Sequence, residues 1–125
     1  MKQSIEIPVP NAIFLILDFD YGTLPDALAD GLITATSSSI VVGTAPDVDG
    51  NVEILLMNID PVDQRHLARV FDSTIDTPNR DISVCTVYNE RVLATQVKNV
   101  KTVVQVWVND EIAPTKVVIV VPEAQ

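Results

Sequence analysis

Short runs of aliphatic residues that alternate with polar residues recur along almost the whole chain. Besides the run at 4–9, they lie at 33–44, 52–59, 67–75, 82–87, 92–97, 102–108 and 116–121. A period of two is typical of a strand with one buried face, and the turn residues between runs favour short connections. The pattern predicts an all-β protein, an antiparallel β-sandwich of about eight strands forming one domain over residues 1–125.

Two segments depart from this alternation. Residues 13–17, Ile-Phe-Leu-Ile-Leu, are continuously apolar, which predicts a strand buried on both faces. In residues 24–30, Pro25 and Asp26 suit the first turn of a helix and Gly31 suits its end, so we expect one short helix there. Long helices do not alternate with the strands, which argues against a doubly wound α/β fold.

The charge of the chain limits its partners. There are 17 Asp and Glu against 8 Lys and Arg, and the formal net charge is −9. Such a surface repels nucleic acid phosphates and anionic lipid, so we expect neither nucleic acid nor a membrane as partner. It favours a basic protein partner, or it serves only to keep the protein soluble.

Cys85 is the single cysteine, so an intrachain disulfide is ruled out. It lies in Ser-Val-Cys-Thr-Val, which predicts a buried thiol on a strand. No signal peptide is visible, and the apolar stretch at 12–17 is far too short to span a membrane. These features together predict a cytoplasmic protein.

Residues 14–24, Phe-Leu-Ile-Leu-Asp-Phe-Asp-Tyr-Gly-Thr-Leu, resemble the aspartate motif of haloacid dehalogenase-like phosphatases. The resemblance implies that Asp18 is a nucleophile and Asp20 an acid/base. However, Tyr21 adds a residue to the motif, and the remaining chain lacks the alternating helices, later Lys and distal acidic pair of that family. This phosphatase is therefore only a second alternative. We predict no enzyme and no catalytic residue, and interpret both carboxylates as the solvated end of a strand.

Residues 47–51, Asp-Val-Asp-Gly-Asn, resemble a calcium loop but lack its third ligand and its bidentate Glu. Turn chemistry explains the same residues. We expect no metal and no cofactor, and keep a small-ligand- or calcium-binding β module as the alternative function. The lone His66 has no partner in a recognisable motif, so we interpret it as structural.

Trp107, the only tryptophan, alternates with valines that face the other way. Its own face carries the polar residues Gln105 and Asn109. Two interpretations stay open: a core residue on the second face of a sheet, or an exposed anchor of the kind that dominates binding energy at interfaces.

Four segments resemble the competence protein J family, small inhibitors of a DNA-entry nuclease, and similar immunity proteins. They are Leu-Pro-Asp-Ala-Leu-Ala-Asp-Gly at 24–31, Ile-Val-Val at 40–42, Val-Glu-Ile-Leu-Leu-Met-Asn at 52–58 and Val-Gln-Val-Trp-Val at 104–108. The resemblance implies a β-sandwich whose acidic surface blocks a basic nuclease cleft. It assigns no individual site residues.

We therefore predict a non-enzymatic, acidic protein-binding module, an inhibitor or immunity protein of a basic nuclease or toxin. Carboxylates in strand ends and loops would speed encounter with a basic partner, and an aromatic anchor would slow release. The candidate partner-binding residues are Asp18, Asp20, Tyr21, Asp47, Asp49, Trp107, Asp110 and Glu111.

Overall fold

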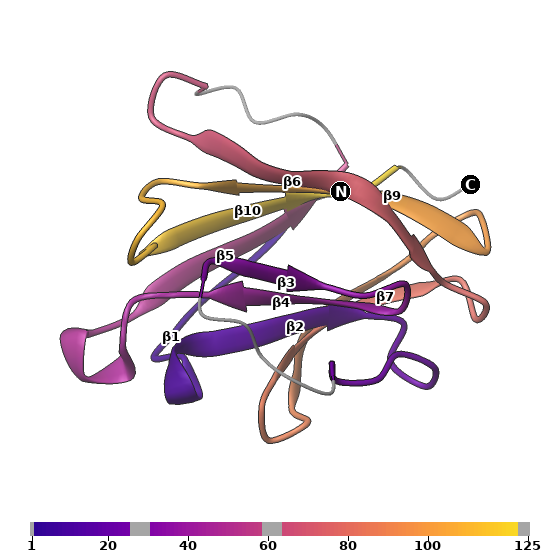
Figure 1. Ribbon diagram of the computed structural model, residues 1–125, viewed down its shortest axis with the longest axis horizontal. Coiled ribbons are helices and arrows are strands. Elements are labelled where there is room, and N and C mark those ends of the chain that lie inside the picture. Colours follow the sequence, from indigo (N-terminus) through magenta and orange to yellow (C-terminus); the bar gives the residue numbers. More distant parts are fainter. Residues whose placement is uncertain (1, 26–30, 59–63, 123–125) are drawn as a thin grey trace.

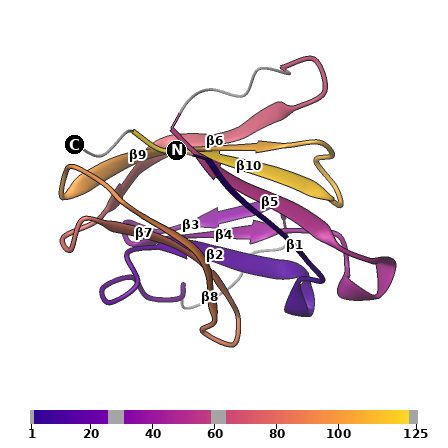
Figure 2. The ribbon, with the colours of Figure 1, turned by 180° about the vertical axis from the view of Figure 1, so that it is seen from behind.

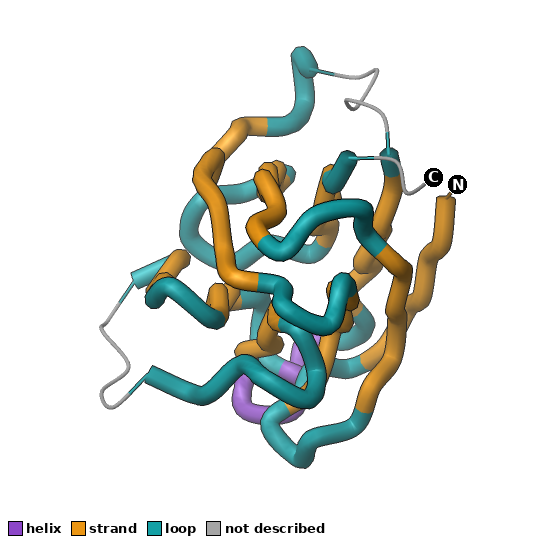
Figure 3. Tube along the Cα trace, turned by 90° about the vertical axis from the view of Figure 1, so that its right-hand side faces the viewer, coloured by secondary structure: helices purple, strands orange, loops and turns teal. Residues whose placement is uncertain are grey.

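The computed structural model describes residues 2–25, 31–58 and 64–122, and within these ranges nearly all regular structure is β-strand. Two five-stranded sheets pack face to face as the two layers seen in Figure 1. The predicted all-β sandwich is confirmed. Figure 3 separates the strands from the loops and turns that join them.

The order of strands across each sheet decides which loops become neighbours. Sheet A contains, in order, β1 (Lys2–Ile7), β5 (Val52–Met57), β10 (Lys116–Val120), β9 (Lys101–Val108) and β6 (Ala68–Asp76). Sheet B contains, in order, β3 (Ile33–Ala35), β4 (Ser39–Gly43), β2 (Ile13–Leu17), β7 (Asp81–Thr86) and β8 (Arg91–Gln96). Two 3-10 turns, η1 (Pro10–Ala12) and η2 (Asp47–Asp49), lie in the connections β1–β2 and β4–β5.

The main core fills the space between the sheets. Phe14 and Ile16 of β2 and Ile54 and Leu56 of β5 are all fully buried in it. Removing each such side chain from water stabilises the fold by roughly 1.5–3 kcal/mol. The two residues of each pair are two apart in sequence, because alternate side chains of a strand point to the same face.

Each sheet also buries apolar side chains on its outer face. On sheet A these residues are Leu55, Met57, Trp107, Val118 and Val120. On sheet B they are Leu15, Leu17, Val41 and Cys85. The second buried face explains the continuous apolar run in β2, and the strand predicted to be buried on both faces is confirmed.

The structure differs from the sequence prediction in strand number, because the run at 33–44 forms two strands. The backbone N–H of Thr36 donates to the carbonyl of Ser39 at 2.9 Å, and the Thr36 hydroxyl accepts from the backbone N–H groups of Ser38 and Ser39 at 3.2 Å. This turn makes β3 and β4 an antiparallel hairpin. The described residues therefore form ten strands, one more than the nine apolar runs of the sequence.

A second difference is the pairing of β5 and β10, which run parallel, whereas the other strand pairs are antiparallel.

The expected short helix falls mainly on residues 26–30, outside the described ranges. No helix in the described parts of the chain is long and apolar enough to cross a membrane.

Candidate functional site

The eight candidate residues do not gather in one place. β2 is antiparallel to β4, with Ile13 opposite Gly43 and Leu17 opposite Ser39, so the loops after these two strands lie at opposite ends of the sandwich. Residues 18–22, together with 77–81, form a region that we call the Asp18 end. Residues 46–50 and 109–114 lie at the other end, as Figure 2 shows, and we call them the loop-pair surface.

Asp18 is a buried structural residue, so its interpretation as the solvated end of a strand is wrong. It is 0% exposed. One carboxylate oxygen accepts from the backbone N–H of Asn79 at 2.7 Å, and the other accepts from the Asn79 side-chain amide at 3.1 Å. Both oxygens are occupied inside the protein, which leaves Asp18 unsuited to meeting a partner.

Asp20 and Tyr21 lie in a tight turn after Asp18 and are exposed. The carbonyl of Asp18 accepts from the backbone N–H groups of Tyr21 at 3.0 Å and Gly22 at 2.8 Å. A Cβ at Gly22 would lie 2.6 Å from both Leu17 Cβ and the Ser38 carbonyl oxygen. The close approach to neighbouring elements therefore requires glycine at this turn.

The two loops of the loop-pair surface are linked at their bases. The backbone N–H of Ala45, just before the first loop (46–50), donates to the carbonyl of Pro114, at the end of the second loop (109–114), at 2.9 Å. Asp47, Asp49, Asp110 and Glu111 are all exposed there, and neither loop contains Lys, Arg or His. The two loops thus carry four exposed carboxylates and no basic residue, while Arg65 and His66 line a cavity beside Asp110 and Glu111.

Local hydrogen bonds fix the second loop. The Asp110 carboxylate accepts from the backbone N–H groups of Ile112 at 2.7 Å and Ala113 at 3.1 Å. These bonds hold the pKa of Asp110 below its usual value, because they stabilise the charged form. The side-chain oxygen of Asn109 also accepts from the backbone N–H groups of Thr115 at 3.1 Å and Lys116 at 3.0 Å.

Trp107 is a core residue on the outer face of sheet A, so its interpretation as an exposed anchor is wrong. Only 9% of it is exposed, and it packs in the cluster that contains Leu55 and Val118. Its Nε1 donates to the side chain of Gln105 at 3.1 Å, and the Arg69 guanidinium lies 5.8 Å from the ring centroid.

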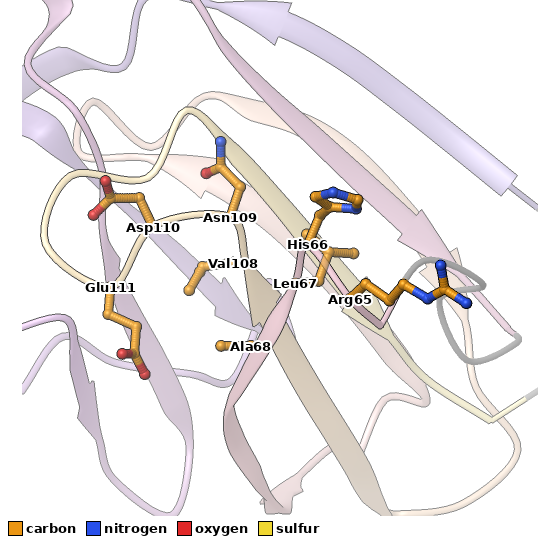
Figure 4. Close-up of a pocket in the computed structure, with 8 residues that line it drawn as sticks. All are labelled: Arg65, His66, Leu67, Ala68, Val108, Asn109, Asp110 and Glu111. Carbon is orange, nitrogen blue, oxygen red and sulfur yellow. The ribbon is translucent and has the colours of Figure 1, made fainter.

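A cavity of about 400 Å³ lies between the start of β6 and the second loop (Figure 4). Its apolar lining residues are Leu67, Ala68 and Val108. Asp110 and Glu111 lie at the left of the view and Arg65 at the right. The side chains of His66 and Asn109 both point upward between them. Five of its eight lining residues are polar or charged, with acidic and basic side chains among them. It therefore differs from the mostly apolar pockets that hold small ligands.

A second, more apolar cavity of about 240 Å³ lies on the outer face of sheet B, lined by Leu15, Leu17, Gly22, Leu24, Cys85, Thr86, Val87 and Asn89. It is smaller than the roughly 300–1,000 Å³ of typical ligand pockets.

The prediction that Cys85 is buried is confirmed. Burial raises the pKa of its thiol to about 11; Arg91 opposes this shift and Asp81 adds to it. A thiol that stays protonated at neutral pH is a poor nucleophile.

The structural context of the two motif resemblances also differs from their families. Asp18 ends an antiparallel strand of a sandwich, whereas the phosphatase motif requires an α/β fold. Asp47 and Asp49 lie in η2, and in the described ranges no group of three or more His, Cys, Asp or Glu could hold a metal ion.

Sequence reasoning missed two exposed residues of the loop-pair surface and one structural partner. Val48 is 87% exposed and Ile112 is 93% exposed. The available signal was an aliphatic residue next to carboxylates within a turn cluster. Asn79 carried no signal, because its role depends on Asp18, 61 residues earlier.

No protein family model and no curated protein matches this sequence. Among solved structures, the chain is similar to the "Crystal structure of ComJ, inhibitor of the DNA degrading activity of NucA, from Bacillus subtilis". The TM-score is 0.72, and the match covers 98% of this chain and 96% of that one at 13% sequence identity. This chain therefore has the fold of ComJ over nearly its whole length.

Proposed function

We propose that this chain is a non-enzymatic protein-binding module that inhibits a basic, DNA-degrading nuclease. The observation that carries the proposal is the similarity of the whole fold to ComJ, an inhibitor of the DNA-degrading activity of NucA. Because both chains are covered almost completely, the similarity extends over the whole β-sandwich.

The charge of the chain supports this proposal. A groove that attracts DNA phosphates also attracts carboxylates, and this chain has a formal net charge of −9. Complementary charge speeds encounter and orients the two proteins. Inhibition then requires only that the bound module occupies the groove, so no chemical step by this chain is needed.

The residues proposed to meet the nuclease are the exposed candidates: Asp20, Tyr21, Asp47, Asp49, Asp110 and Glu111. Asp18 and Trp107 are left out, because their side chains are buried and make contacts inside the protein. We also propose that the inhibitor acts in the cytoplasm, which its single, free Cys85 fits.

The proposal is tested with a DNA-degradation assay. The purified protein is titrated against NucA and against purified nucleases of the organism that makes this chain, with plasmid DNA as substrate. We expect at least one nuclease to lose its activity near a 1:1 ratio, with weaker inhibition as salt rises. Full nuclease activity at a large molar excess of this protein, in every assay, would contradict the proposal.

A further inference from the structure

The two most exposed large hydrophobic side chains of the described residues both lie on the loop-pair surface. They are Ile112, 93% exposed, and Val48, 87% exposed. Val48 stands between Asp47 and Asp49, and Ile112 follows Asp110 and Glu111. Single exposed aliphatic residues are common, but here one lies on each of two loops that are linked at their bases, and each has carboxylates beside it in the chain. An apolar centre with a charged rim is the usual arrangement of a protein interface.

The second loop is held in place before any partner arrives. Asp110 accepts two backbone hydrogen bonds, and so does the Asn109 side chain, whose amide also donates to the Thr115 hydroxyl at 2.9 Å. The bond from Ala45 to Pro114 ties this loop to the chain that leads into the first one. Ile112 is therefore presented on a fixed turn, and less conformational freedom is lost on binding.

We propose that the loop-pair surface is the docking surface of this protein, with Val48 and Ile112 as its apolar anchors. Its occupant is a partner protein that offers an apolar depression ringed by Lys and Arg. Charge complementarity carries this choice, since the two loops have four carboxylates and no basic residue. The inference rests on the proposed function and adds to it the end of the sandwich that enters the nuclease groove.

The Asp18 end provides the matched control. Leu24 is 57% exposed and Val100 is 51% exposed. The amide of Thr23 bonds the Ser38 hydroxyl, and the carbonyl of Val100 bonds the amide of Thr77, which places both control residues near that end. The double variant Leu24→Ser/Val100→Ser therefore removes two exposed aliphatic side chains away from the loop-pair surface.

The experiment compares Val48→Ser/Ile112→Ser with Leu24→Ser/Val100→Ser and the unaltered chain. Each protein is measured for binding to, and inhibition of, NucA and the purified nucleases of the source organism. Urea unfolding is used to check that each variant is folded. We expect the loop-pair variant to dissociate about thirtyfold faster or more, as for anchors at the centre of an interface, with little change in the association rate. The control should stay within about twofold of the unaltered chain.

The outcomes separate the two proposals. Inhibition that is equally strong in the loop-pair variant overturns the docking surface and leaves the nuclease inhibitor standing. Binding that is lost in this variant, to a nuclease whose activity never falls, supports the docking surface and overturns the inhibitor. If no nuclease is bound at all, both proposals are overturned.

Discussion

Two carboxylates at the Asp18 end, those of Asp18 and Asp81, accept hydrogen bonds from other parts of the fold. The carboxylates of the loop-pair surface bond only within their own loop or to none of the described residues. Asp18 binds Asn79, and Asp81 accepts from the amide of Phe19 at 3.0 Å and the hydroxyl of Ser83 at 2.8 Å. Asp110 bonds its own loop. Acidic residues that look alike in sequence thus stabilise the fold at one end and remain available at the other.

Burial explains this difference. A buried carboxylate must be compensated by hydrogen bonds, because leaving it unpaired away from water is costly. Asp18 sits where β2 leaves the sheet and must be paired, which fixes the turn after it. The loops at 46–50 and 109–114 project into solvent, so their carboxylates need no partner in the protein. This contrast leads to predictions that differ between the ends.

The largest effect is expected for Asp18→Ala. The variant removes the two hydrogen bonds that the backbone and side-chain amides of Asn79 donate to a buried carboxylate, and it should lower the free energy of unfolding by about 2–4 kcal/mol. Asp20→Ala is the control, since Asp20 is exposed and its loss should change stability by less than about 0.5 kcal/mol. Urea unfolding measures both variants. Equal, small effects would show that Asp18 is not structural.

Gly22→Ala should also destabilise the Asp18 end. The added methyl group would lie 2.6 Å from Leu17 Cβ and from the Ser38 carbonyl, so the turn must shift, at a cost of roughly 1–3 kcal/mol. Gly43→Ala is the matched control, because its Cβ would meet ordinary contacts of 3.5 Å or more. Thermal unfolding compares the two. A destabilised Gly43→Ala with an unaffected Gly22→Ala would contradict the geometry of this end.

Charge on the loop-pair surface should act on encounter with the nuclease and not on folding. For a nuclease that the protein inhibits, Asp47→Asn/Asp49→Asn should lower the association rate at low salt by about 3–10-fold and flatten its dependence on salt. Glu6→Gln/Glu90→Gln makes the same change in net charge at two exposed residues elsewhere and should have a smaller effect. Stopped-flow binding at two ionic strengths measures this. Salt-independent association in the unaltered chain would remove the electrostatic mechanism.

The strands could be predicted from sequence because period-two alternation reflects a local property, the pleat of a strand between core and solvent. The turn at 36–39 was less visible, since its bonds from the Ser38 and Ser39 amides to the Thr36 hydroxyl are local ones that Ser and Thr can form in many contexts. Parallel pairing of β5 and β10 involves segments about 60 residues apart, and no local pattern encodes it.

Residues of the site were harder to predict because exposure depends on contacts far along the chain. Asp18 and Asp20 look alike in sequence, but Asp18 is buried and bonded to the distant Asn79, whereas Asp20 is exposed. The alternation around Trp107 correctly showed two faces, but sequence could not show that the outer face of sheet A is itself buried. The turn chemistry of Asp47 and Asp49 drew attention away from Val48 between them.

The smallest effect is expected for the pKa of Asp110. Backbone N–H groups of Ile112 and Ala113 lower its pKa in the folded chain, so this group stabilises the fold fully above its unfolded pKa. That contribution is lost as the pH falls through the folded pKa. Carboxyl NMR titration should give Asp110 a lower pKa in the folded chain than in urea.

Ile112→Pro removes the first of the two donors and should raise the pKa of Asp110 toward its usual value, whereas Ile112→Ala keeps the N–H and should leave it low. The same pKa in both variants would mean that the turn does not hold the carboxylate. If the difference is found, one carboxylate of the loop-pair surface is fixed in place and stays charged in acid better than an unrestrained aspartate. That behaviour suits a group that must meet a basic groove in one orientation.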